Sequence, residues 1–177
     1  MWIKVEWQKS PITNKKVASQ NKTLFSPRIE WQMIFGSKSY CIIFYHVRKD
    51  DIKIHWLIQY INPKNDSLIS LEYNNNHLYY IPDIDDFILQ GYNSYDKMGY
   101  KPFTYKSGLE EYNTIGKNNV KNAKNHIDKY VIHVFALNSE LNKEIKSPSY
   151  FLDGEFLTKN FSKKIIDDAR IIYLDKK

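Results

Sequence analysis

The residues of this sequence that could catalyse a reaction or bind a metal are five histidines, one cysteine and a short acidic run. No two histidines have the spacing of a zinc-hydrolase motif, and the chain has no nucleophile elbow, P-loop or dinucleotide-binding glycine motif. Cys41 lies in an apolar run, which predicts a buried and inert thiol. The acids Asp83, Asp85 and Asp86 follow Pro82, a pattern typical of a turn and a helix start. The sequence therefore predicts no metal site, no cofactor and no nucleophile–base pair, and we expect a protein that is not an enzyme.

His55 is the histidine whose surroundings suggest a role. Residues 52–61 alternate like a strand, with Trp56 and Ile58 on one face and His55 and Leu57 on the other. His55 and Trp56 are then expected to point to opposite faces, so that one lines a cavity while the other fills the core. The alternative is a partly buried histidine that forms hydrogen bonds to its neighbours and has no ligand.

Short strands are the main secondary structure that the sequence predicts. Runs of β-branched and aromatic residues lie at 40–47, 52–61 and 130–137, with weaker runs at 68–73 and 78–81 and a last one at 169–174. Their spacing favours an antiparallel sheet or sandwich. Four side chains on apolar faces are expected to be buried, namely Trp31, Ile43, Trp56 and Phe135.

Two further segments carry distinct predictions. Asp153 can cap a helix in which Leu157, Phe161 and Ile165 fall on one face at i, i+4 and i+8. Residues 101–125 contain two glycines, many Asn and Lys residues and few apolar ones, which predicts a long inserted surface loop.

Composition limits the class of protein. The chain of 177 residues is 42% hydrophobic and 15% aromatic, which excludes a disordered polyelectrolyte and predicts one domain over residues 1–177. The net charge of +6 comes mainly from lysine, since only Arg28, Arg48 and Arg170 are arginines, so nucleic-acid binding is a minor alternative. A single cysteine excludes a disulfide framework. No apolar run predicts a transmembrane helix, and the first residues do not resemble a signal peptide, so we expect an intracellular, cytoplasmic protein.

The order of several short motifs adds a resemblance to a known family. Residues 26–31, SPRIEW, and residues 36–43, GSKSYCII, resemble the SPxLxW and GTKSxALI segments of the phosphatidylethanolamine-binding protein (PEBP) family. Residues 55–63, HWLIQYINP, resemble its HWxxxNIP, and residues 90–94 and 98–102 resemble its xGxNS and GYxGPxPP. Residues 130–138, YVIHVFALN, resemble YxFxxYALD. The motifs stand in the family's order over residues 26–174, so the chain resembles a divergent member.

The resemblance implies a mainly β fold, in which a large antiparallel sheet packs on a smaller sheet and a helix lies near the C-terminus. It also implies a small pocket for phosphate-like anions, including phospholipid headgroups, and a regulatory role in kinase or protease pathways. His55 matches the pocket histidine, Pro102 a proline of the pocket loop and Tyr130 the pocket tyrosine. His126 stands four residues before Tyr130, whereas the family's histidine stands two before it, where Asp128 is found here.

The sequence departs from the family pattern where the pocket should have its acids. Residues 44–51 stand in place of the family's DPDxP, and its GPxPP is reduced to residues 101–103. His46 and Arg48 offer donors there instead of carboxylates. We expect a non-enzymatic binding protein with a degenerate anion pocket that acts through a protein partner, its cavity filled by side chains such as Tyr45 or Phe103. The alternative is a phosphate or phospholipid-headgroup binder in which His55 and a second donor face an open pocket.

Overall fold

The computed structural model describes ten segments of the chain: residues 1–7, 21–22, 26–48, 51–68, 78–81, 86–101, 104–105, 109–113, 128–139 and 162–175. Strands dominate these segments, and the one helical element among them is the 3-10 turn η3, Ser162–Lys164. In the described segments, no helix has the length and apolar character needed to span a membrane.

The larger sheet has seven strands in the order β10-β12-β11-β4-β5-β8-β7, and every neighbouring pair is antiparallel. In chain order the strands are β4 (Ser39–Arg48), β5 (Asp51–Ile61), β7 (Leu78–Ile81), β8 (Asp86–Gln90), β10 (Leu109–Asn113), β11 (Asp128–Leu137) and β12 (Ile165–Asp175). The centre of the sheet, β11-β4-β5, coincides with the three strongest strand patterns of the sequence. The predicted antiparallel, mainly β fold is thus confirmed.

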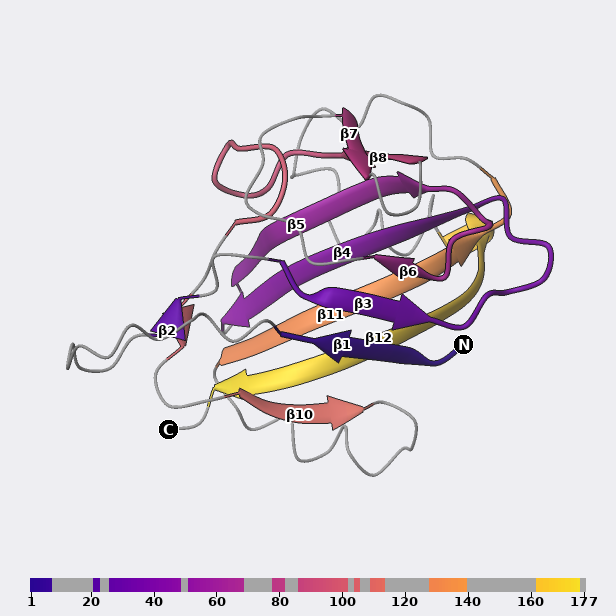
Figure 1. Cartoon of the computed structure of the whole chain (residues 1–177). Helices are drawn as coiled ribbons and strands as arrows, with labels where there is room; N and C mark the ends of the chain where they lie inside the picture. Colours follow the sequence, from indigo (N-terminus) through magenta and orange to yellow (C-terminus); the bar gives the residue numbers. More distant parts are fainter. Residues whose placement is uncertain are drawn as a thin grey trace.

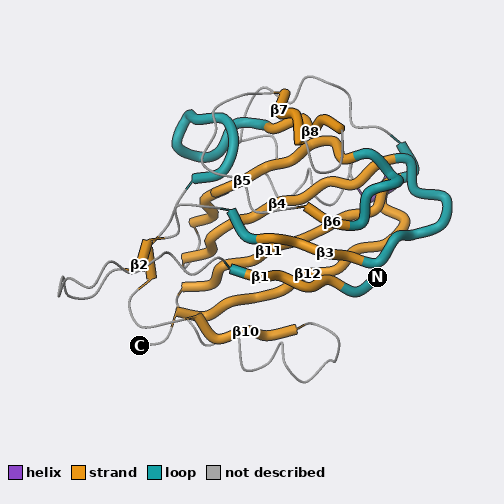
Figure 2. Tube along the Cα trace, in the orientation of Figure 1, coloured by secondary structure: helices purple, strands orange, loops and turns teal. Residues whose placement is uncertain are grey.

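A second sheet lies against one face of the first (Figures 1 and 2). It consists of β1 (Ile3–Glu6), β3 (Arg28–Trp31) and β6 (Ser67–Leu68), and a separate short pair joins β2 (Asn21–Lys22) to β9 (Thr104–Tyr105). Alternate residues of β1 and β3 are buried, so each strand turns one apolar side toward the larger sheet.

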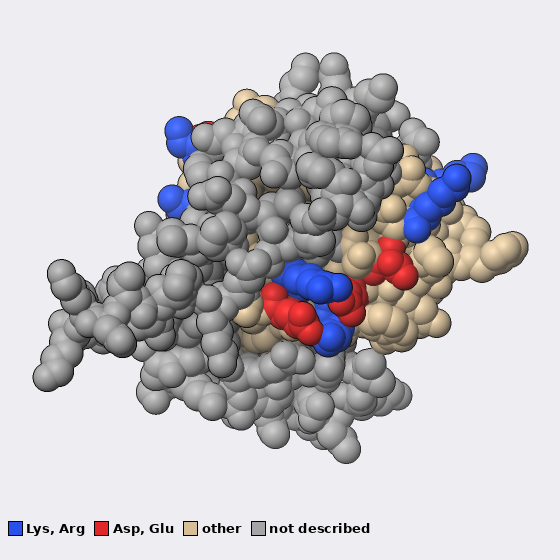
Figure 3. Space-filling view, in the orientation of Figure 1, with Lys and Arg blue, Asp and Glu red and all other residues tan. Residues whose placement is uncertain are grey.

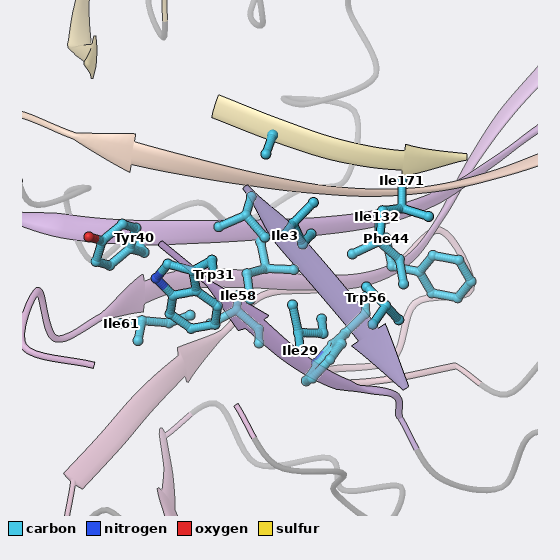
Figure 4. Packing of buried hydrophobic residues seen from close by; sticks show 14 of the residues in the cluster. Ile3, Ile29, Trp31, Tyr40, Phe44, Trp56, Ile58, Ile61, Ile132 and Ile171 are labelled. Carbon is cyan, nitrogen blue, oxygen red and sulfur yellow. The ribbon is translucent and has the colours of Figure 1, made fainter. Parts of the chain in front are cut away.

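The main core fills the space between the two sheets. Ile3, Ile29 and Trp31 from the smaller sheet pack with Phe44 and Trp56 from the larger one (Figure 4). The outward side of the smaller sheet is charged instead, with ion pairs of Lys4 with Glu6 and of Arg28 with Glu30, over β1 and β3 in Figure 3. The alternation of β1 and β3 therefore separates a buried face from a solvated one.

Both faces of the larger sheet bury apolar side chains. The second face carries Cys41, Ile43, Ile54, Leu57, Phe135 and Leu137. The four residues expected to be buried are at most 3% exposed: Trp31 and Trp56 in the core between the sheets, and Ile43 and Phe135 on the second face. Burial of side chains of this size stabilises the fold by about 1.5–3 kcal/mol each for the aliphatic and Phe cases.

The helix expected from Asp153 to Ile165 is not confirmed. Residues 151–161 lie outside the described segments, and the expected C-terminal end of the helix is a 3-10 turn followed by β12. Ile165 begins that strand and pairs with Leu137. Two consecutive β-branched residues, Ile165 and Ile166, favour an extended chain once a neighbouring strand is available.

The prediction of a surface loop over residues 101–125 is wrong for two stretches. Thr104–Tyr105 forms β9, and Leu109–Asn113 forms β10, which pairs with β12 at the edge of the larger sheet. An edge strand has one strand neighbour, so it can form with fewer apolar residues than a central one. Apart from Lys101, the remaining residues of this stretch, like most of the weak run at 68–73, are outside the described segments.

Candidate functional site

A bulge in β5 determines where His55 points. Phe44 of β4 pairs with Trp56, but the next residue, Tyr45, pairs with Ile54, so His55 is an extra residue in β5. Such a bulge breaks the strict alternation of side chains. The His55 ring consequently lies 5.2 Å from the Phe44 ring, on the same face as Trp56, and Ile54 packs on the opposite face. The prediction that His55 and Trp56 point to opposite faces was therefore wrong.

Five aromatic or imidazole rings surround this bulge, and we name them the His55 ring cluster: Phe44, His46, His55, Tyr95 and Tyr130. The centroid of the His55 ring lies 5.5 Å from that of Tyr95 and 6.2 Å from those of His46 and Tyr130. His55 is only 3% exposed. Three residues expected at the pocket, His46, His55 and Tyr130, are thus brought together at one end of β4, β5 and β11. The other two, Pro102 and His126, lie outside the described residues.

His46 and Tyr130 are direct partners across β4 and β11. Their rings stack with centroids 4.3 Å apart and 13° between the planes. Tyr130 is buried and His46 is partly exposed. This stack closes one side of the His55 ring cluster.

Residues 91–101 close another side by pairing with the bulged part of β5, beside which they are drawn in Figure 1. The amide of Lys101 donates to the carbonyl oxygen of His55 at 2.7 Å, and the amide of Ser94 donates to that of Ile54 at 2.9 Å. The hydroxyl of Ser94 in turn accepts a hydrogen bond from the amide of Ile54 at 2.8 Å. The backbone groups that the bulge removes from the sheet are therefore bonded to this loop.

Two buried amides lie just before and within this loop, and the sequence analysis did not give them a role. Gln90 accepts a hydrogen bond from the indole N–H of Trp56 at 2.8 Å. Asn93 donates to the carbonyl of Gly99 at 3.1 Å and accepts from the amide of Tyr95 at 2.9 Å. The signal was present in the QGYNS segment, because a buried amide beside a glycine usually supports a turn.

The electrostatics of the cluster keep His55 uncharged. Burial lowers the pKa of His55 to about 4, nearby His46 and Lys101 act in the same direction, and its hydrogen bond to the carbonyl of Lys101 opposes them. Its Nδ1 lies 3.1 Å from that carbonyl oxygen, which can only accept, so Nδ1 carries the proton. The ammonium of Lys101 lies 5.3 Å from the centre of the Tyr95 ring. The cluster thus combines a neutral imidazole with phenol rings and a neighbouring cation.

Two other residues considered in the sequence lie on the opposite face of the larger sheet. Tyr45 packs there against the cluster of Ile43 and Phe135, so it does not fill a cavity beside His55. Phe103, the other side chain expected to fill the cavity, lies outside the described residues. Cys41 is fully buried on that face, and burial raises the pKa of its thiol. The expectation of a buried cysteine is confirmed.

The same face carries a histidine–aspartate pair that the sequence did not reveal. Nε2 of His133 lies 2.6 Å from a carboxylate oxygen of Asp168. Burial lowers the pKa of His133, and the hydrogen bond from His133 lowers the pKa of Asp168. The pair joins adjacent strands, β11 and β12, and therefore depends on their register. In the described part of the chain, no group of three or more His, Cys, Asp or Glu side chains could hold a metal ion.

Comparisons with known proteins identify the fold. No protein-family model and no curated protein matches the chain. Among solved structures, it resembles E. coli YbcL, described as a new member of the mammalian PEBP family, with a TM-score of 0.58 and 18% identity over 87% of this chain and 82% of that one. It also resembles CT736 of Chlamydia trachomatis, a putative phosphatidylethanolamine-binding protein homologue, with a TM-score of 0.54 and 18% identity over 86% and 82% of the two chains. This likeness shows that the chain shares the fold of these two proteins.

Proposed function

We propose that this chain, a divergent protein with the phosphatidylethanolamine-binding protein fold, is a non-enzymatic binding protein that acts through contacts with a protein partner. The observation that carries the proposal is the packing of the His55 ring cluster, in which His46, Tyr95 and Tyr130 occupy the surroundings of His55. Rings in mutual contact leave His55 little room for a small ligand. This packing supports the proposal that the small-anion pocket implied by the sequence resemblance is degenerate in this chain.

The protonation state of His55 supports the same proposal. Its Nδ1 proton is donated to the carbonyl of Lys101, so the neutral ring can present only an acceptor at Nε2. An anion would require the charged imidazolium, which the lowered pKa of about 4 disfavours at neutral pH. His55 thus stabilises the bulge and the loop at residues 91–101 and does not supply a positive charge.

The buried thiol of Cys41 supports a role without catalysis. It is fully buried, its pKa is raised, and it lies on the opposite face of the sheet from the His55 ring cluster. A nucleophile of this kind would need an exposed thiolate beside a base. A partner in a kinase or protease pathway follows from the family resemblance and forms part of the proposal.

A phosphate or phospholipid-headgroup binder is the second candidate. Two basic groups favour it, since His46 is partly exposed and the ammonium of Lys101 lies over Tyr95 beside the cluster. A cation beside a site attracts anions even where no carboxylate anchors the ligand.

Calorimetric titration with phosphoethanolamine and with inorganic phosphate separates the two candidates. The packed cluster predicts no saturable heat with either ligand at micromolar concentrations, because a small anion depends on a few polar contacts that must all be available. Micromolar binding that is lost in His55→Ala and kept in His133→Ala, a histidine on the opposite face, would establish the headgroup binder instead.

A further inference from the structure

An exposed apolar tip lies at the end of the larger sheet away from the His55 ring cluster. Residues 32–38 connect β3 to β4 and project beside the first residues of the chain (Figure 1). Phe35 is 103% exposed, Met33 is 54% exposed and Trp2 is 43% exposed. The carbonyl of Trp2 accepts a hydrogen bond from the amide of Gln32 at 3.1 Å, which places Trp2 beside this connection. We name Trp2, Met33 and Phe35 the Phe35 tip.

The tip is held in a defined conformation by buried groups beneath it. The backbone amide of Ser37 donates a hydrogen bond to the carbonyl of Ile34 at 3.2 Å across a turn. Within this turn Gly36 has a φ of +84°, in the left-handed region that favours glycine. The hydroxyl of the fully buried Tyr40 accepts a hydrogen bond from the amide of Ile34 at 2.8 Å. Ile34 itself packs against the main core. Phe35 is therefore presented to solvent by a turn whose other contacts anchor it to the protein.

Three lysines lie at the same end of the sheet as the tip. The amide of Lys38 is bonded to the carbonyl of Leu137, and the amide of Asn138 to the carbonyl of Lys164, so Lys38, Lys163 and Lys164 lie at the same end of the sheet. The acids described near this end are Asp66, Asp167 and Asp168. The carboxylate of Asp167 is bound by the amino group of Met1 at 2.6 Å, and that of Asp168 lies 2.6 Å from Nε2 of His133. Figure 3 shows an uncharged projection at this end, with basic atoms on one side of it and acidic atoms farther along the surface. The tip is thus apolar at its point, and lysines share its end of the sheet with acids of which two are bound to other groups of the protein.

We propose that the Phe35 tip docks this protein onto membrane surfaces that contain anionic lipids. Aromatic and methionine side chains on a projecting turn can enter the boundary between headgroups and acyl chains, while nearby lysines contact acidic headgroups. A protein partner is less well matched to this surface. Three side chains of this size together offer at most about 450–750 Å², which is below the roughly 800 Å² that a stable protein interface buries on each partner.

The position of the tip gives the docked protein an orientation. Residue 39 at the start of β4 and His46 near its end are about 23 Å apart at the usual rise of a strand. A membrane bound at the Phe35 tip therefore lies at the opposite end of β4 from the His55 ring cluster. The docking surface is independent of any ligand at the cluster, which stays available to a partner in solution.

Co-sedimentation with vesicles tests this proposal. We expect binding to phosphatidylcholine vesicles that contain about 30% phosphatidylserine, weaker binding to pure phosphatidylcholine, and a decrease as salt is added. Phe35→Ser should weaken binding by at least about tenfold, since an exposed aromatic supplies much of the apolar contact. The matched control is Tyr92→Ser, which removes a 36% exposed aromatic from the loop at the other end and should leave binding unchanged.

Fluorescence of Trp2 gives a second measurement that does not depend on Phe35. Trp31 and Trp56 are buried and Trp7 packs partly buried against the main core, so a blue shift that comes from Trp2 on adding the phosphatidylserine vesicles should vanish in Trp2→Phe. No binding to these vesicles would overturn the proposal, as would binding that survives Phe35→Ser. Loss of vesicle binding in His55→Ala but not in Phe35→Ser would assign the interaction to headgroup capture at the cluster. Self-association that Phe35→Ser abolishes, without vesicle binding, would make the tip a contact between copies of the chain.

Discussion

The imidazole of His46 stacks on the phenol ring of Tyr130 across β4 and β11, with centroids 4.3 Å apart. The stack lies beside His55, whose ring is 6.2 Å from each of the two. Because Tyr130 is buried and is also part of the main core, the wall of the candidate site and the core of the protein share a side chain. A change that opens the site is therefore expected to destabilise the fold.

Shortening Tyr130 tests this link. We expect Tyr130→Ala to lower the free energy of unfolding by about 3–5 kcal/mol, because it leaves a cavity beside His46 and Phe44. Tyr130→Phe, which keeps the ring, should cost only about 1 kcal/mol. Urea unfolding measures both values, and similar costs for the two variants would show that the ring does not support the cluster.

The buried hydrogen bond between Trp56 and Gln90 gives a second prediction. Gln90→Leu leaves the indole N–H of Trp56 buried without this acceptor and should lower the free energy of unfolding by about 1–3 kcal/mol. In Trp56→Phe the donor is absent, so adding Gln90→Leu to that variant should cost less. A double-mutant cycle in which the two costs simply add would contradict a direct interaction.

Asn93 gives a prediction for the loop at residues 91–101. Asn93→Ala removes the bonds to Gly99 and Tyr95, and we expect hydrogen exchange in this loop to increase while the amides of β11 keep their protection. The surface variant Asp96→Asn is the control within the same loop. Unchanged exchange at Tyr95 and Lys101 in Asn93→Ala would show that the amide does not hold the loop.

The pKa of His55 predicts how stability depends on pH. The folded protein holds this pKa at about 4, below the ordinary value of 6.5, so the unfolded chain binds a proton first as the pH falls. Stability is fully present above pH 6.5 and should fall by up to about 1.4 kcal/mol per pH unit towards pH 4, or about 3 kcal/mol in total. His55→Asn retains a donor for the carbonyl of Lys101 but cannot titrate, so its stability should depend less on pH.

His133 contributes to the same pH dependence of stability as His55. Burial also lowers its pKa, whereas Asp168 raises it, so His133→Asn should remove another part of the same slope. Asp168 contributes to stability over a lower pH range than the two histidines. Its pKa is lowered, so its contribution is lost as the pH falls through and below the ordinary value of 3.8. Equal slopes between pH 6.5 and 4 in wild type and His55→Asn would contradict the neutral, buried state of His55.

Much of the fold could be predicted from local patterns. The runs around Ile43, Trp56 and Phe135 identified the central strands and their buried residues, because alternation and β-branching act within one strand. The expected helical end at Ile165 was wrong because helical spacing over a few residues competes with pairing to β11, which lies far away in the sequence. For the same reason the edge strand β10 was taken for a loop.

The candidate site could be predicted in its residues but not in its geometry. His46, His55 and Tyr130 were identified from the residues and the family resemblance, and the structure brings them together. The bulge that turns His55 to the face of Trp56 arises from the register between β4 and β5, so alternation along β5 alone could not reveal it. The pair of His133 and Asp168 depends on register between strands in the same way.

NMR of the imidazole groups of His46 and His55 during titration with phosphoethanolamine tests the central claim most directly. The packed cluster predicts ring-to-ring contacts between His46 and Tyr130, a neutral His55 with its proton on Nδ1, and no saturable shift of either imidazole as the ligand is added. Saturable shifts at micromolar concentrations that disappear in His55→Ala would show an open anion pocket and would contradict this account.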